Sequence, residues 1–380
     1  MTVDEALLDD ADRISAADPG AMLREVASAG AQVRQALVTC ADARLDSLVG
    51  GGRPRAVVVA GMGGSGIAGH VLQAAAGPGC PVPVERVRGW TLPAWVGAMD
   101  VVLAVSSSGR TAETLGCARE ALRRGSRVVV VAAEGSPLVD LAEQAGAPWV
   151  PVPDGRAPRA NLWALSVPLL VAADLLGIVD APADELGRVA DLLDDLAERC
   201  GPARETADNP AKLLAADLVG TLPLVWGTSD LAGIAAYRFL CQLAENAKYP
   251  AVNGVLPEAL HNQVVTFAGP FAGAGSGDDL FRDRVADDGR LRLRLVMLGD
   301  TVEHELVARG AAAAVALAGE YGVPVSRISA VGEHPLERMA SLCAIGDFAS
   351  VYLGLVHGVD PTPIVPIQEL KARIGAGGYG

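Results

Sequence analysis

The chain has 380 residues, of which 51% are hydrophobic and 20% are charged, and its formal net charge is −14. This length exceeds what one ordinary hydrophobic core supports, so we expect about two domains. The composition is that of a globular protein and excludes a largely disordered one. The acidic balance argues against nucleic acid or an anionic membrane as a partner. An anionic ligand would need a local site of amides, hydroxyls and a few basic residues.

The cysteines and the N-terminus exclude several further classes of protein. The six cysteines stand singly, and none has the C-x-x-C spacing of a zinc site or redox motif, so we expect no metal site. The acidic start MTVDEALLDDADR is unlike a signal or transit peptide, and we predict a cytoplasmic protein. The most apolar stretch, 162–179, contains Asp174, and we interpret it as a buried helix and not a membrane span.

The first half of the chain has the pattern of an α/β unit. Residues 3–48 have a helical pattern that breaks near 18–20, and three glycines at 50–52 end it. The short apolar run at 56–60 predicts a strand buried on both faces. Further strands are predicted at 82–87, 100–105, 127–133 and 149–152, with helices from about 67 and at 112–124. Strands that alternate with helices predict right-handed crossovers and a parallel sheet.

A second α/β unit is predicted after an acidic amphipathic helix at 184–199. Its strands are expected at 222–226, 292–298 and 325–328, and its helices at 232–247, 302–320 and 335–357. Residues 272–290 are rich in Gly and Asp and predict a mobile surface insertion, and 375–380 predict a loose tail. The predicted fold is α/β, with two doubly wound parallel-sheet lobes and flanking helices. We divide the chain into an N-terminal helical region (1–49), a first lobe (50–182), a connector (183–209) and a second lobe with a C-terminal helix (210–380).

A glycine-rich loop at 61–66 follows the first predicted strand and precedes a helix. Such a loop lets backbone N–H groups approach an anion at the positive end of the helix. Its spacing also fits G-x-G-x-x-G, with Glu85 about twenty residues further on, which is the pattern of a dinucleotide site. A tight turn that merely needs small residues would have the same glycines. The loop alone therefore leaves a phosphosugar site, a nicotinamide-dependent oxidoreductase and a structural turn open.

A second polar loop, Ser106 to Thr111, follows the third predicted strand. Its hydroxyls and the N-terminal amides of the next helix suit a phosphate monoester. Ligands of open α/β sheets bind outside the carboxyl ends of strands, so two such loops are expected to form one pocket. A helix cap would account for one hydroxyl, at Ser108 or Thr111, but not for the whole cluster. The loop therefore favours a phosphate site.

These two loops, GMGGSGIAG and SSSGRTAET, resemble those of the sugar isomerase (SIS) domain superfamily. Within it, the segments AENAKYPAVNGVLPEALHNQ, APRANLW and DPTPIVPIQELKARIG resemble the bifunctional phosphoglucose/phosphomannose isomerase family, over roughly residues 50–375. The resemblance implies an isomerase of hexose 6-phosphates that works as a homodimer and needs neither a cofactor nor a metal.

The resemblance also implies roles for particular residues. The residues implied to contact the sugar are Gly63, Gly64 and Ser65, and those implied to bind phosphate are Ser106, Ser108 and Thr111. Those implied to be catalytic are Glu245 as base, Arg159 as enediolate partner, and His261 and Lys371 in ring opening, with His261 donated across the dimer interface. The usual H-N-E of the family stands here as His261-Asn262-Gln263. From local sequence alone, Glu245 is better interpreted as a solvated carboxylate and Lys371 as a solvated basic residue, and only the family pattern favours Arg159 over the nearby Arg156.

The implied chemistry needs few groups. One carboxylate can take a proton from C2 of an aldose phosphate and return it to C1 through a cis-enediol. A non-catalytic phosphosugar-binding module is the alternative, although the acidic N-terminal region has no basic recognition helix. The nicotinamide-dependent oxidoreductase is the third hypothesis.

Overall fold

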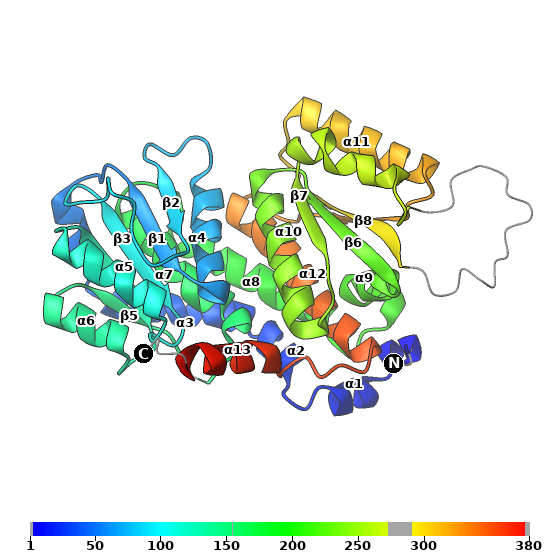
Figure 1. The fold of residues 1–380 in the computed structure, drawn as a ribbon, viewed down its shortest axis with the longest axis horizontal. Helices are drawn as coiled ribbons and strands as arrows, with labels where there is room; N and C mark the ends of the chain where they lie inside the picture. Colours follow the sequence, from blue (N-terminus) through cyan, green and yellow to red (C-terminus); the bar gives the residue numbers. More distant parts are fainter. Residues whose placement is uncertain (1–2, 154, 273–290, 377–380) are drawn as a thin grey trace, which may run out of the picture.

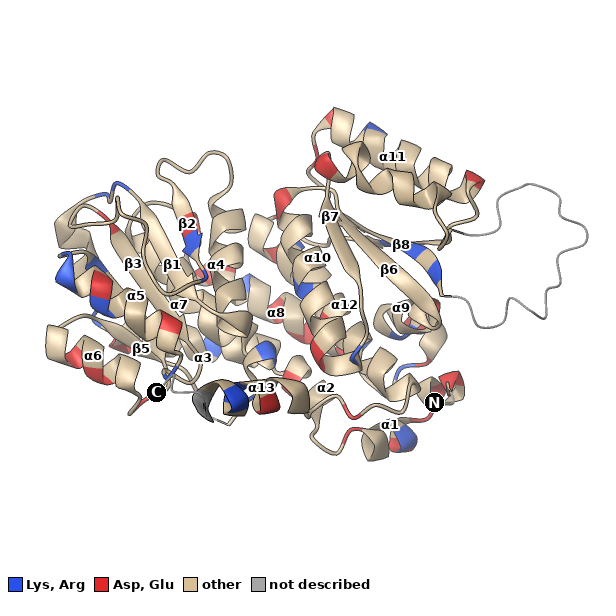
Figure 2. Cartoon of the chain, viewed as in Figure 1, with Lys and Arg blue, Asp and Glu red and all other residues tan. Residues whose placement is uncertain are grey.

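The structure is a computed structural model that describes residues 3–153, 155–272 and 291–376. Two parallel sheets lie side by side, each covered by helices (Figure 1). Acidic and basic residues are interspersed along both halves (Figure 2). The predicted α/β fold with two parallel sheets is confirmed. The domain boundaries at 49, 182 and 209 remain a prediction.

The first sheet has the strand order β2-β1-β3-β4-β5, with every pairing parallel. Its strands are β1 (Val57–Gly61), β2 (Val84–Val87), β3 (Val101–Ser106), β4 (Arg127–Ala132) and β5 (Trp149–Pro151). Valine-rich strands suit this sheet because both of its faces are covered. Val57 and Val59 of β1 belong to one core cluster, and Val58 and Ala60 belong to the cluster on the opposite face.

The helices of the first half divide between these two faces. They are α4 (Gly63–Ala76), α5 (Ala112–Arg123), α6 (Pro137–Ala145) and α7 (Leu162–Leu175). Buried residues of α4 and α7 share the core of Val57, and those of α5 and α6 share the core of Val58. From β1 the chain continues to β2, which pairs with one edge of β1, and then to β3, which pairs with the other edge. The topological switch point, where ligands bind in such sheets, therefore lies between β1 and β3.

The second sheet has the order β7-β6-β8-β9 and is also parallel. Its strands are β6 (Thr221–Gly227), β7 (Val252–Val255), β8 (Arg292–Gly299) and β9 (Val325–Ser329). The helices of this half are α9 (Pro210–Leu218), α10 (Asp230–Gln242), the π-helix η5 (Leu243–Ala247), η6 (Glu258–His261), η7 (Gln263–Ala268), α11 (Glu305–Glu320) and α12 (Pro335–Val356). By length and apolar composition α12 could cross a membrane, but the whole apolar window is buried inside this protein, so it is a core helix.

The remaining helices join the two halves. They are η1 (Glu5–Asp9), α1 (Ala11–Ala17), α2 (Met22–Ala27), α3 (Ala29–Asp42), η2 (Leu45–Gly51), η3 (Pro158–Ala160), α8 (Ala183–Arg199), η4 (Thr206–Asp208) and α13 (Val365–Ala376). The N-terminal helices contact both halves, because α3 packs on α7 and α2 packs on α12. In Figure 1 the red helix α13 runs beneath the first half toward its junction with the second.

The structure differs from the predicted elements in a few places. Helices α6 and α9 and strand β7 were not predicted; β7 contains Asn253 and Gly254 and is an edge strand, so it lacks an apolar run. The helix after the glycine loop begins at Gly63 and not near 67, because the glycines form its first turn. The predicted helix 232–247 ends as an α-helix at 242 and continues as η5. Most of the predicted insertion (273–290) and of the tail (377–380) lie outside the described residues.

Candidate active site

The glycine turn and the serine loop meet at the switch point of the first sheet. β1 and β3 are paired in register, with Gly61 opposite Val105. The backbone N–H of Ser107 donates to Oγ of Ser65 over 3.0 Å, which joins the two loops directly. The structure therefore brings the predicted sugar and phosphate loops side by side at the carboxyl ends of adjacent strands.

The glycine turn has little room for side chains because it lies against the segment that carries Arg159. Gly63 has φ +53°, a conformation that favours glycine. A Cβ on Gly64 would lie 3.0 Å from the carbonyl oxygen of Pro158 and 3.3 Å from the amide nitrogen of Arg159. Small residues here let the first turn of α4 approach η3 closely.

Two hydroxyls of the serine loop, those of Ser106 and Thr111, face each other, and that of Thr111 does not cap the helix. Ser106 is 1% exposed, and its Oγ lies 2.9 Å from Oγ1 of Thr111. Thr111 is the N-cap residue of α5, yet its side chain makes no capping hydrogen bond. The Oγ of Ser108 accepts a 3.3 Å bond from the backbone of Arg110. The cap interpretation is therefore wrong for Thr111, and its hydroxyl stays with the cluster at the start of α5.

Gly109 allows this loop to pack tightly on the next strand connection. Its φ is +62°, and a Cβ at this position would lie 1.9 Å from Oγ of Ser136. The carbonyl of Gly109 accepts a 3.1 Å bond from the backbone of Leu138 in α6. The serine loop thus packs on the start of α6, and this contact holds the hydroxyls of the loop in place.

Arg159 crosses from the first half of the molecule to the second. Its side chain is 3% exposed, and its Nε donates to Oδ1 of Asn246 over 2.7 Å. Its Nη2 donates to the carbonyls of Pro361 and Thr362 over 2.8 and 2.9 Å. Nη1 lies 3.8 Å from Oε2 of Glu245. Burial lowers the pKa of this guanidinium, and the Glu245 carboxylate opposes that shift.

Glu245 lies in η5, the π-helical turn that follows α10. Such turns are rare in proteins, and where they occur they are often part of a functional site. Burial raises the pKa of Glu245, and the positive charges of Arg159, Arg238, Lys248 and Lys371 partly offset that rise. A carboxylate whose pKa is moved toward neutrality is better suited to accept and return a proton.

A buried polar network supports Arg159 and its partner Asn246. The Nδ2 of Asn246 donates to Oγ of Ser350 over 2.9 Å. Arg238 donates two bonds to Asp347, of 2.8 and 2.7 Å, and its Nη2 also donates to the carbonyl of Arg159 over 3.0 Å. The network was not predicted. The signal for it was a charged residue inside each of two apolar helices, α10 and α12.

Of the two residues predicted to act in ring opening, Lys371 lies within electrostatic reach of Glu245, whereas among the described residues no polar contact joins His261 to it. Lys371 is exposed on α13, and its charge acts on the pKa of Glu245, so it lies within electrostatic reach. His261 is exposed at the end of η6. Within the described parts of this one chain, no hydrogen bond or ion pair joins His261 to Glu245 or Arg159. Contacts within the chain therefore connect the glycine turn, the serine loop, Arg159 and Glu245, whereas Lys371 is linked only through its charge and His261 stands apart.

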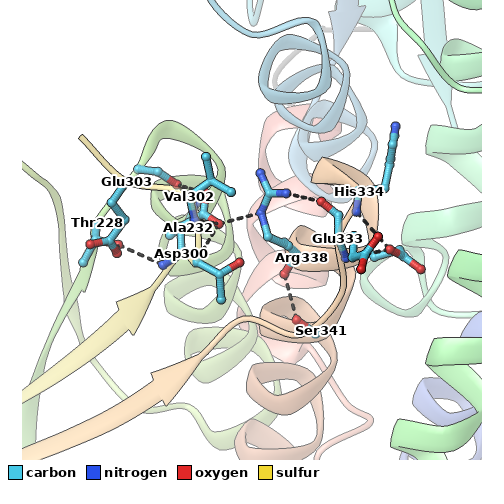
Figure 3. Close-up of polar contacts among 12 residues, drawn as sticks. Thr228, Ala232, Asp300, Val302, Glu303, Glu333, His334, Arg338 and Ser341 are labelled. Atoms are coloured by element: carbon cyan, nitrogen blue, oxygen red, sulfur yellow. Dashed lines mark hydrogen bonds and ion pairs between the residues drawn. The ribbon is translucent and has the colours of Figure 1, made fainter. Parts of the chain in front are cut away.

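Figure 3 shows polar side chains at the switch point of the second sheet, near the ends of β6 and β8, where Thr228, Asp300 and Glu303 also line a cavity. The Asp300 carboxylate accepts from Nε of Arg338 over 2.7 Å and from Oγ of Ser229 over 2.8 Å. Thr228 donates to the Glu303 carboxylate. An internal carboxylate thus lies at the start of α10, where an anion would bind. This leaves the first sheet as the candidate site for a phosphosugar.

A curated relative from Caldicellulosiruptor bescii is named "Bifunctional phosphoglucose/phosphomannose isomerase". It is 33% identical over 318 residues, which are 84% of this chain and 89% of the relative. The chain belongs to this family. The family profile "Bacterial phospho-glucose isomerase C-terminal SIS domain" also matches residues 207–374.

The chain is also similar to one further relative with a different printed name and to one solved structure. A Sulfolobus acidocaldarius protein named "D-glucosamine-6-phosphate 4-epimerase" is 33% identical over 208 residues, 55% of this chain and 62% of that protein. A crystal structure of a hypothetical protein from Thermus thermophilus superposes with a TM-score of 0.71, covering 98% of this chain and 95% of that one at 17% identity. The second likeness concerns the fold alone.

Proposed function

We propose that the protein interconverts glucose 6-phosphate, mannose 6-phosphate or both with fructose 6-phosphate, using Glu245 as the base. The family membership supports the substrate class. The single observation that carries the mechanism is the approach of Glu245 to Arg159, with 3.8 Å between Oε2 and Nη1, beside the two polar loops. A base and a cation next to a phosphate cradle are what an enediol mechanism requires.

In the proposed mechanism each group has one task. The phosphate binds to the hydroxyls of Ser106, Ser108 and Thr111 and to amides at the start of α5. The sugar lies over Gly63, Gly64 and Ser65. Glu245 removes the proton at C2 and returns it to C1, and Arg159 Nη1 stabilises the charge that develops on the enediolate oxygen. Glucose and mannose 6-phosphates differ only at C2, so both give the same enediol.

Ring opening is the step that needs a second copy of the chain. We assign it to His261, with Lys371 assisting, and His261 would come from the other subunit of a homodimer. The exposed position of His261 and the lack of a contact to Glu245 within the described part of the chain support this arrangement. Lys371 does not have to come from the other subunit, because within its own chain it already lies within electrostatic reach of Glu245. We expect this enzyme to work in the cytoplasm without a bound cofactor.

An assay of the purified protein with each hexose 6-phosphate tests the function. We expect fructose 6-phosphate from glucose 6-phosphate and from mannose 6-phosphate, without added nicotinamide or metal. Binding of both sugars without product would favour a non-catalytic phosphosugar-binding module. An epimerised amino sugar phosphate and no ketose would favour the activity printed for the Sulfolobus relative. Quenching of protein fluorescence by NADH would favour the oxidoreductase.

A further inference from the structure

The N-terminal helices contact the backbone on both sides of Arg159. Gln32 on α3 is 3% exposed, and its Nε2 donates to the carbonyl of Ala160 over 2.7 Å. Its Oε1 accepts a 3.4 Å bond from the amide of Ala164 in the first turn of α7. The N-cap residue of α7, Asn161, makes no side-chain capping bond of its own. Gln32 therefore supplies an acceptor for the start of α7 and a donor for the end of η3.

Glu25 on α2 makes the matching contact before Arg159. Its carboxylate accepts a 3.2 Å bond from the backbone N–H of Ala157. Its charge also acts on the guanidinium of Arg159. Arg159 is thus the centre of a short segment, 157–160, that is bonded to α2 at one end and to α3 at the other.

The same N-terminal region also supports the carbonyls that bind Arg159. A Cβ on Gly20 would lie 1.9 Å from Oγ1 of Thr362, so residue 20 lies directly against residue 362. The turn at Gly20 is held by Asp18, which is buried and accepts 2.9 Å bonds from the amides of Met22 and Leu23. Because Thr362 accepts from Nη2 of Arg159, this packing limits how the guanidinium can move.

These contacts leave one orientation for the guanidinium. Asn246 holds its Nε, the carbonyls of 361 and 362 hold Nη2, and Nη1 faces Glu245. We propose that Gln32 is a positioning residue of this active site, which fixes the segment of Arg159 so that Nη1 points at the reacting carbons. This inference rests on the proposed function, because it gives the N-terminal helices a role in the same reaction.

The test is the variant Gln32→Leu, which keeps the approximate size of the side chain and removes its bonds to Ala160 and Ala164, together with a 3.1 Å bond to Oγ of Ser28 at the start of its own helix. We expect kcat to fall about 10- to 100-fold because a misplaced catalytic group loses this much. The KM for the hexose phosphate and the inhibition constant of inorganic phosphate should stay near the wild-type values, because the phosphate loop is untouched. The matched control on the same helix is Arg34→Ala, whose ion pairs go to Asp191 and Asp194 of α8. It should leave kcat unchanged.

A double-mutant cycle separates positioning from a general loss of structure. In an Arg159→Lys background, Gln32→Leu should change kcat by less than about twofold, because the group that it positions is already altered. An equal loss of kcat in both backgrounds would overturn the proposal. If Gln32→Leu does not fold, Glu25→Ala acts on the other end of the segment and should show the same lack of additivity. A wild-type protein without isomerase activity refutes the proposed function, whereas an active wild type with an unimpaired, folded Gln32→Leu refutes only this inference.

Discussion

The Nη1 of Arg159 lies 3.8 Å from Oε2 of Glu245, and the two side chains come from opposite halves of the molecule. Arg159 follows the first sheet in sequence, and Glu245 lies in the π-helical turn after α10 in the second half. The two groups proposed to act on the substrate therefore depend on how the halves pack. The carbonyl of Arg159 also accepts a 3.0 Å bond from Arg238, so backbone and side chain both cross the junction.

Replacing the proposed base tests the chemistry directly. Glu245→Gln keeps the shape of the side chain and removes its ability to accept a proton. We expect kcat to fall about 100-fold or more, the usual contribution of general base catalysis, with KM little changed. Steady-state kinetics with fructose 6-phosphate measures both. Turnover near the wild-type value would show that another group is the base.

The burial of Glu245 predicts how activity and stability depend on pH. Burial raises its pKa, so kcat/KM should fall on acidification at a pH above the pKa of an exposed glutamate. A raised folded-state pKa contributes stability below the unfolded pKa, and this contribution is lost as pH rises through the folded value. Glu245→Gln should therefore raise Tm at pH 7, with a smaller gain near pH 4. A gain that grows on acidification would contradict the direction of the shift.

The serine loop should control affinity and leave turnover largely unaffected. Ser106→Ala removes a buried hydroxyl that lies 2.9 Å from Thr111. Since a hydrogen bond to a charged group contributes about 1.5–3 kcal/mol, KM and the inhibition constant of inorganic phosphate should rise about tenfold or more. Ser136→Ala is a useful comparison, because its hydroxyl is buried below the loop without a partner among the described residues. A change in kcat alone in Ser106→Ala would argue against a phosphate site here.

Subunit mixing tests the assignment of His261 to the neighbouring active site. His261→Ala and Glu245→Gln dimers should each be nearly inactive in opening and isomerising the closed sugar. If the two are denatured together and refolded, about a quarter of the wild-type sites should be intact, because half of the dimers are mixed and each has one complete site. No recovery of activity in the mixture would show that His261 acts within its own chain or not at all.

The buried pair Arg238–Asp347 should be among the most sensitive positions for stability. Both side chains are buried, and Asp347 accepts bonds from Arg238 and from Gln242. Asp347→Asn leaves the guanidinium buried without its counter-charge, which typically costs about 3–5 kcal/mol. Urea unfolding should show this loss, whereas Asp194→Asn, which weakens an exposed pair with Arg34, should change stability by less than about 1 kcal/mol.

The pattern of the chain predicted both sheets, because fully buried parallel strands are continuous apolar runs such as Val57–Gly61 and Val101–Ser106. The two polar loops were predicted for the same reason, since glycines and serines directly follow those runs. The helix start at Gly63 was missed because glycines are poor helix formers, and here close packing against Pro158 decides the conformation. The contacts of Gln32, Asp18 and Asn246 depend on which helices meet in space, and no local pattern contains that information.

Residue 20 touches residue 362, so the surroundings of Arg159 are completed by segments that leave the ribosome at very different times. While the chain is being made, Arg159 follows its N-terminal supports, but the carbonyls of 361 and 362 are made 202 and 203 residues after it. Until then two guanidinium donors have no protein acceptor, and burying them would be costly. We therefore expect a nascent chain to leave the Arg159 guanidinium hydrated and the site inactive, and to bury this side chain only after residue 362 has emerged.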